Sequence, residues 1–141
     1  MSLPMATSYQ RAAGRYADDS VATASPTRLL VMLYDRLLLD LNRGEQAQRT
    51  GDRGAAAATL GHAQEIVAEL LSSLDQNAWD GGPRLASVYT WLLKELSGSI
   101  VTDDADRTAA CRACVEPLRD AWAEAAAHGA PGQPVLTGAT A

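Results

Sequence analysis

The residues best suited to chemistry are two cysteines, Cys111 and Cys114, which are spaced as Cys-x-x-Cys. A redox-active pair of this kind lies at the N-terminus of a helix, where the helix dipole lowers the thiol pKa. Here both cysteines fall in the middle of an expected helix and on its apolar stripe, so we interpret them as small core side chains. A zinc site would require further ligands, and the chain has just two histidines, His62 and His128.

Histidines and carboxylates elsewhere do not form a catalytic pattern either. His62 and Glu65 stand three positions apart, but a di-iron bundle needs two Glu-x-x-His motifs in a fixed order and two further carboxylates. We therefore expect a solvent-exposed pair. Asp35 and Asp40 are five positions apart and do not share a helix face. The sequence predicts neither an enzyme nor a metal or cofactor site.

Composition limits the classes of partner. The chain has 141 residues, of which 47% are hydrophobic, enough for one domain with a packed core. The net charge of −5 disfavours nucleic acid and anionic membrane surfaces, both of which attract basic proteins. Charged residues interrupt the most apolar stretch, residues 29–41, and no segment resembles a signal peptide or a membrane span. We expect a cytoplasmic protein that does not insert into membranes.

Apolar spacing and turn signals predict four helices. Ser25 and Pro26 are typical of an N-cap and a first helical residue, and this first helix is expected to end near Arg43, before Gly44. Apolar residues then recur every three or four positions in three later segments. These stripes are Leu60, Ala63, Val67, Leu70, Leu71 and Leu74; Leu85, Val88, Leu92, Leu96 and Ile100; and Cys111, Cys114, Val115, Leu118, Trp122 and Ala125.

Each later helix has a local start signal. The second follows Gly51-Asp52, the third begins at Pro83, and Thr102 is expected to cap the fourth. Pro117 lies inside the fourth stripe and is expected to kink that helix, because proline removes a backbone hydrogen bond.

The predicted fold is all-α: an antiparallel four-helix bundle with short connections over residues 25–128. No segment shows the alternation of apolar and polar residues that is typical of a strand. Residues 1–24 are expected to form an extended or short-helical, partly flexible N-terminal segment. Residues 129–141, in which Gly, Pro and Thr dominate, are expected to be a disordered tail.

Two helices carry more apolar surface than a bundle requires. Ten of the thirteen residues from 29 to 41 are apolar, whereas an outer helix needs a stripe only about 100° wide. One explanation is a central helix that its neighbours cover on all sides, and the other is a surface left for a partner. The third helix favours the second explanation, because Tyr89, Trp91 and Leu93 point away from its main stripe.

The N-terminal part of the chain contains a specific sequence block. Tyr16 stands alone, the run VATASP follows at 21–26, and MLYD follows at 32–35. This block resembles the opening signature of the flagellar secretion chaperone FliS family. Arg36 departs from that signature, because the family usually has a small residue after the Asp.

Later segments extend the resemblance over residues 16–125. Residues 66–74 resemble the second helix of the family, residues 85–96 its tyrosine-bearing third helix, and residues 118–122 its closing Leu…Ala-Trp. Residues 79–83 form a more elaborate turn than the family usually has.

The resemblance implies a cytoplasmic chaperone of flagellin with an antiparallel four-helix bundle. Such a protein binds the C-terminal segment of flagellin, which is disordered when free and turns helical as it wraps around the chaperone. Binding prevents premature polymerisation and delivers the subunit to the flagellar export gate. The resemblance also implies that residues 12–23 lie along the groove when no client is bound. The residues expected on the groove side are Tyr16, Val21, Met32, Leu33, Tyr34, Tyr89 and Trp91.

Two alternatives to the flagellin chaperone remain at this point. A generic helical adaptor with a different partner would share the bulk features but would have no reason to carry the block at 16–35. A small ferritin-like metalloenzyme would need a ligand set that the sequence does not contain.

Overall fold

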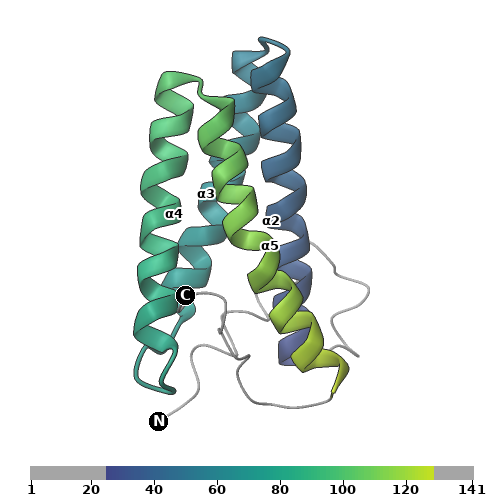
Figure 1. Cartoon of the computed structure of the whole chain (residues 1–141), viewed down its shortest axis with the longest axis vertical. Helices are drawn as coiled ribbons and strands as arrows, with labels where there is room; N and C mark the ends of the chain where they lie inside the picture. Colours follow the sequence, from purple (N-terminus) through teal and green to yellow (C-terminus); the bar gives the residue numbers. More distant parts are fainter. Residues whose placement is uncertain (1–24, 129–141) are drawn as a thin grey trace.

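The computed structural model describes residues 25–128, and all of its helices pack as one bundle (Figure 1). The helices are α2 (Pro26–Arg49), α3 (Arg53–Ser73), α4 (Gly82–Thr102) and α5 (Ala105–Ala127). Within these residues the chain forms no strand, and the predicted all-α four-helix fold is confirmed. The expectations for residues 1–24 and 129–141 fall outside the described residues.

Successive helices run antiparallel and close a ring (Figure 1). α2 packs against α3 and α5, and α4 also packs against α3 and α5. α2 and α4 are therefore diagonally opposite each other across the core. Short connections allow this up-and-down arrangement, as is usual in such bundles.

Helix α2 begins as the sequence predicts but ends later. The hydroxyl group of Ser25 accepts a hydrogen bond from the Arg28 N–H at 3.1 Å, which caps the first turn. The helix then continues past Gly44 to Arg49, so the predicted end near Arg43 is wrong.

The glycine that ends α2 is Gly51, whose φ of 83° lies in the left-handed region. Its N–H donates to the Gln48 carbonyl oxygen at 3.2 Å, and the Asp52 N–H donates to the Ala47 carbonyl oxygen at 2.8 Å. This pair of bonds is a Schellman motif, which satisfies the last carbonyl groups of a helix.

Gly44 has a packing role inside α2. A Cβ at this position would lie 2.3 Å from the Leu60 Cδ2 atom, so only glycine lets α3 approach α2 this closely. The sequence pattern could not distinguish this role from helix termination, because both require glycine.

The remaining helix starts follow local signals with one correction. Asp52 caps α3, since its carboxylate accepts the Ala55 N–H at 3.1 Å, and Pro83 lies in the first turn of α4.

The cap of α5 is Asp104 rather than Thr102, because the Asp104 carboxylate accepts the Asp106 and Arg107 N–H groups. α4 itself extends to Thr102.

Helix α5 is continuous through Pro117. Proline removes the bond to the carbonyl group four residues earlier, at Ala113. Both Pro117 and Ala113 lie on the exposed face, where water can satisfy that carbonyl group. The kink predicted at Pro117 stays a prediction.

The core contains leucines from all four helices and a small aromatic cluster. Tyr34 and Tyr89 are fully buried, and Trp122 is 9% exposed, which confirms the prediction that Trp122 is a core residue. Trp79, from the loop before α4, contacts Trp122 edge to face with ring centroids 6.5 Å apart. None of the described helices is both long and apolar enough to span a bilayer.

Candidate functional site

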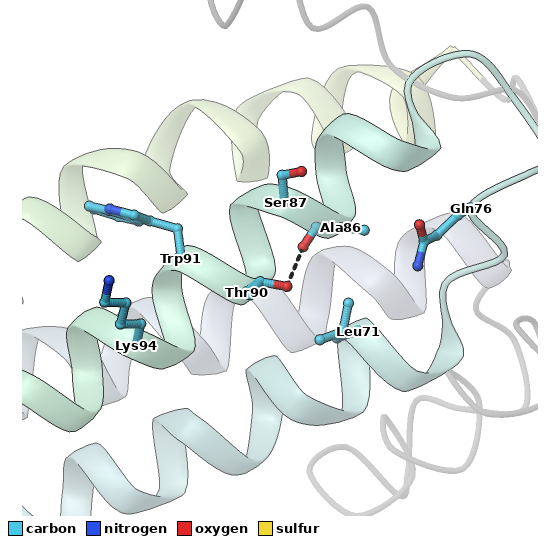
Figure 2. A pocket seen from close by; sticks show the side chains of 7 residues that line it. All are labelled: Leu71, Gln76, Ala86, Ser87, Thr90, Trp91 and Lys94. Atoms are coloured by element: carbon cyan, nitrogen blue, oxygen red, sulfur yellow. Dashed lines mark hydrogen bonds between the residues drawn. The ribbon is translucent and has the colours of Figure 1, made fainter.

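An open groove of about 640 Å³ lies between the C-terminal half of α3 and the N-terminal half of α4. Figure 2 shows Trp91 and Lys94 at one end of this groove and Gln76 at the other. The lining residues are Leu71, Gln76, Ala86, Ser87, Thr90, Trp91 and Lys94. We call this surface the α3/α4 groove.

Helix α4 turns one face to the core and another face to the groove. Leu85, Leu92 and Leu96 are at most 1% exposed and face the core. Trp91 lies on the opposite side and is 41% exposed. A partly exposed tryptophan beside Leu71 and Ala86 is a candidate contact residue for a partner, because tryptophan is enriched among the residues that dominate binding energy.

The two hydroxyl groups that line the groove already have local partners. The Thr90 hydroxyl group donates to the Ala86 carbonyl oxygen at 2.9 Å, and the Ser87 hydroxyl group donates to the Pro83 carbonyl oxygen at 3.1 Å. The loop that carries Gln76 is held by the Asp75 carboxylate, which accepts the Asn77 N–H at 3.1 Å. A ligand in this groove would therefore meet the apolar side chains of Leu71, Ala86 and Trp91 together with the polar side chains of Gln76 and Lys94.

The residues predicted from the sequence to face a client divide into three groups. Leu33, Tyr34 and Tyr89 are at most 1% exposed and belong to the core. Met32 is partly buried at the surface of α2, and Trp91 lies in the α3/α4 groove. The last group, Tyr16 and Val21, lies outside the described residues.

Tyr34 and Tyr89 are held in the core by each other. Their hydroxyl groups form a hydrogen bond of 2.5 Å. Burial raises the pKa of Tyr34 above its ordinary value, and the hydrogen bond with Tyr89 opposes this shift only in part. The Tyr34 hydroxyl group therefore stays neutral at physiological pH, and the two tyrosines act as a structural pair.

Most of the apolar surface of α2 is covered by its neighbours, which favours the first explanation given above for this helix. The residues Leu29, Leu30, Leu33, Leu37 and Leu41 are at most 3% exposed. Among the other large apolar residues of α2, Leu39 is 38% exposed, and Met32 and Leu38 are partly buried.

The cysteines are core residues. Cys111 is fully buried, and Cys114 packs partly buried against the core, as the apolar stripe predicts. Burial raises the pKa of Cys111 from 9.0 to about 12 and also raises that of Cys114. A redox-active or metal-binding cysteine requires a lowered thiol pKa, so the arrangement disfavours both roles.

His62 is not the solvent-exposed partner of Glu65 that the sequence suggests. Its Nδ1 atom forms a hydrogen bond with the carboxylate of Asp40, which is 2% exposed in α2. Arg36 approaches the same carboxylate, with Nε 3.4 Å from Oδ1. A buried carboxylate needs such partners, and the pair joins α2 to α3. Among residues 25–128, no three His, Cys, Asp or Glu side chains are grouped to hold a metal ion.

The sequence predicted Trp91 but missed the other lining residues of the groove, although a signal was present on α4. Ser87, Thr90, Trp91 and Lys94 stand at positions i, i+3, i+4 and i+7, so they share one face of α4. This face is mixed in polarity, and an apolar-stripe search therefore passes over it.

Comparison with known proteins identifies the family of this chain. The family described as flagellar protein FliS matches residues 8–129. The chain belongs to the FliS family. It is also similar to the flagellar secretion chaperone FliS of Bacillus subtilis (strain 168), with 29% identity over 110 residues, which cover 78% of this chain and 82% of that protein.

The FliS signature has two structural roles in this chain. Leu33 and Tyr34 of the signature build the core, whereas Met32 stays at the surface. The two aromatic residues of α4 differ in the same way, since Tyr89 is buried in the core and Trp91 is exposed.

Proposed function

We propose that this protein is a cytoplasmic export chaperone that binds the disordered C-terminal segment of flagellin. Binding prevents premature polymerisation, and the complex is delivered to the flagellar export apparatus. The chaperone has no enzymatic activity of its own in this proposal. Its membership in the FliS family and the name of the Bacillus subtilis relative support a role in flagellar export.

The observation that carries the proposal is the exposed Trp91 in the α3/α4 groove. The core is complete without this side chain, yet 41% of it remains in solvent beside Leu71 and Ala86. An amphipathic segment that folds on binding would cover this surface with apolar residues spaced at i, i+3, i+4 and i+7. Burial of apolar surface would supply the free energy that orders the segment.

The test is calorimetric titration of the chaperone with a peptide that corresponds to the flagellin C-terminal segment of the same bacterium. We expect binding with a negative heat-capacity change, because apolar surface leaves water as the client folds. Trp91→Asp should reduce the affinity by about 2 kcal/mol or more, as at other aromatic contact sites. Absence of binding by the unaltered chaperone would overturn the proposal.

The matched control is Val101→Asp. Val101 lies on the same helix, is 76% exposed, and does not line the groove, so it tests whether any new charge on α4 weakens binding. Equal effects of the two substitutions would remove the groove from the proposal. Tyr16→Asp tests the N-terminal part of the signature in the same titration and should weaken binding without changing the melting temperature.

A generic helical adaptor remains the second candidate. It predicts binding to a different partner and no affinity for the flagellin segment. The titration with the flagellin peptide separates the two, because the adaptor would share the groove but not the client.

A further inference from the structure

Lys94 is the sole lysine of the sequence, and it stands at one end of the α3/α4 groove (Figure 2). The net charge of the chain is −5, with 12 basic and 17 acidic residues, and Lys94 places a positive charge at this surface. On α4 itself, the positions three and four residues away are Thr90, Trp91, Ser97 and Gly98, and none is acidic.

The neighbouring carboxylate is already neutralised by another helix. Glu95 binds Arg107 of α5, with its Oε1 atom 3.2 Å from the Arg107 Nε atom. Other arginines of the bundle are engaged in the same way, since Arg112 binds Glu45 at 2.9 Å and Arg119 binds Asp35 at 2.7 Å. Lys94 has no ion pair with any residue from 25 to 128.

Across the groove, α3 presents apolar rather than acidic surface. Leu71 is the α3 residue that lines the groove, and Gln76 follows in the loop. The groove therefore combines an apolar floor with one cation that no residue from 25 to 128 neutralises. This combination is complementary to an amphipathic segment that carries a carboxylate beside its apolar face.

We propose that the groove recognises its client through an acidic residue at Lys94, together with apolar residues seated between Leu71 and Trp91. This inference rests on the proposed function and adds the chemistry of the contact. Ala86 and Lys94 are eight residues apart on α4, which is about 12 Å along the helix axis. The acidic residue of a helical client lies about two turns from the apolar residue that contacts Ala86.

The experiment titrates the flagellin C-terminal peptide into the chaperone at several salt concentrations. Lys94→Gln should weaken binding about threefold, and Lys94→Glu about tenfold, because a partly exposed ion pair is lost and then reversed. The salt dependence of the affinity should also decrease in Lys94→Gln, because salt screens an exposed ion pair. Circular dichroism verifies that both variants remain folded.

The matched control is Arg43→Glu. Arg43 is an exposed cation on α2, outside the groove, and its replacement changes the net charge by the same amount as Lys94→Glu. If Arg43→Glu and Lys94→Glu weaken binding equally, the effect is the overall charge and the inference is overturned. The proposed function would stand in that case, because the unaltered protein still binds.

A charge exchange identifies which acidic residue of the peptide contacts Lys94. Each acidic residue of the peptide is replaced in turn by lysine, and one such peptide should bind Lys94→Glu more tightly than it binds the unaltered protein. If no peptide restores binding, the carboxylate contact is overturned. If instead the unaltered protein self-associates in sedimentation and Lys94→Glu abolishes this, the groove holds a second copy of the chain and the inference is also overturned.

Discussion

The hydroxyl groups of Tyr34 and Tyr89 meet at 2.5 Å in the centre of the bundle and join α2 to α4. These two helices are diagonally opposite, so the contact crosses the core rather than following a helix–helix seam. Both side chains are completely buried. A hydrogen bond in this position fixes the register of α2 relative to α4, because it holds Tyr34 and Tyr89 at the same height along the bundle axis.

The tyrosine pair predicts non-additive effects of substitution. Tyr34→Phe or Tyr89→Phe alone leaves one buried hydroxyl group without this partner and should lower the free energy of unfolding by about 1–3 kcal/mol. The double substitution should cost less than the sum of the two single ones, because no orphaned hydroxyl group remains. Urea unfolding of the four proteins measures this difference. Strict additivity would show that the hydrogen bond contributes nothing.

The buried thiol of Cys111 predicts a loss of stability at alkaline pH. Its pKa is raised from 9.0 to about 12 by burial, so the folded chain keeps the proton that the unfolded chain releases. The stability contribution is complete below pH 9 and falls as the pH rises from 9 towards 12, by about 1 kcal/mol at pH 10. Cys111→Ala should be less stable at neutral pH, by about 1–3 kcal/mol, but should show a flatter decrease from pH 8 to 10. An unchanged pH profile in this variant would contradict the assignment.

Gly44 and Gly61 predict opposite effects of the same substitution. Gly44→Ala should destabilise the protein by about 1–3 kcal/mol, because a Cβ would lie 2.3 Å from Leu60 Cδ2. Gly61→Ala, in the middle of α3, has nothing within 4 Å of the new Cβ and should stabilise by about 0.5–1 kcal/mol through helix propensity. Thermal unfolding of both variants is the measurement. Stabilisation by Gly44→Ala would show that α2 and α3 can separate at no cost.

Gln48 belongs to a buried polar network, and we expect the stability of the protein to depend strongly on this network. Its amide nitrogen donates to the Ser99 hydroxyl group at 2.9 Å, and its amide oxygen accepts from the Thr108 hydroxyl group at 2.7 Å. Gln48→Ala should lower the free energy of unfolding by about 1–3 kcal/mol, because it removes both bonds and leaves a cavity.

The control for Gln48 is Gln46→Ala, two positions earlier on the exposed face of α2. Surface substitutions of this kind change stability by less than about 0.5 kcal/mol. Chemical denaturation of both variants separates loss of the network from loss of a glutamine in general. Similar effects of the two substitutions would contradict a structural role of the network.

Local chemistry in the sequence determined the number of helices and most of their starts. Ser25, Asp52 and Pro83 act within one helical turn, so their effect on the backbone can be read without knowing the fold. The apolar stripes likewise predicted the core positions of Cys111 and Trp122 correctly. The signature at 16–35 identified the family for the same reason, because it is a property of the residue order alone.

Only the tertiary structure decided which side of a helix each ambiguous residue faces. In α2 nearly every direction is apolar, so the burial of Tyr34 depends on where α3, α4 and α5 lie and not on periodicity. The pairing of His62 with Asp40 and the contact of Gly44 with Leu60 join residues far apart in the chain. The α3/α4 groove has the same origin, since Leu71 and Trp91 belong to different helices and become neighbours only when the bundle closes.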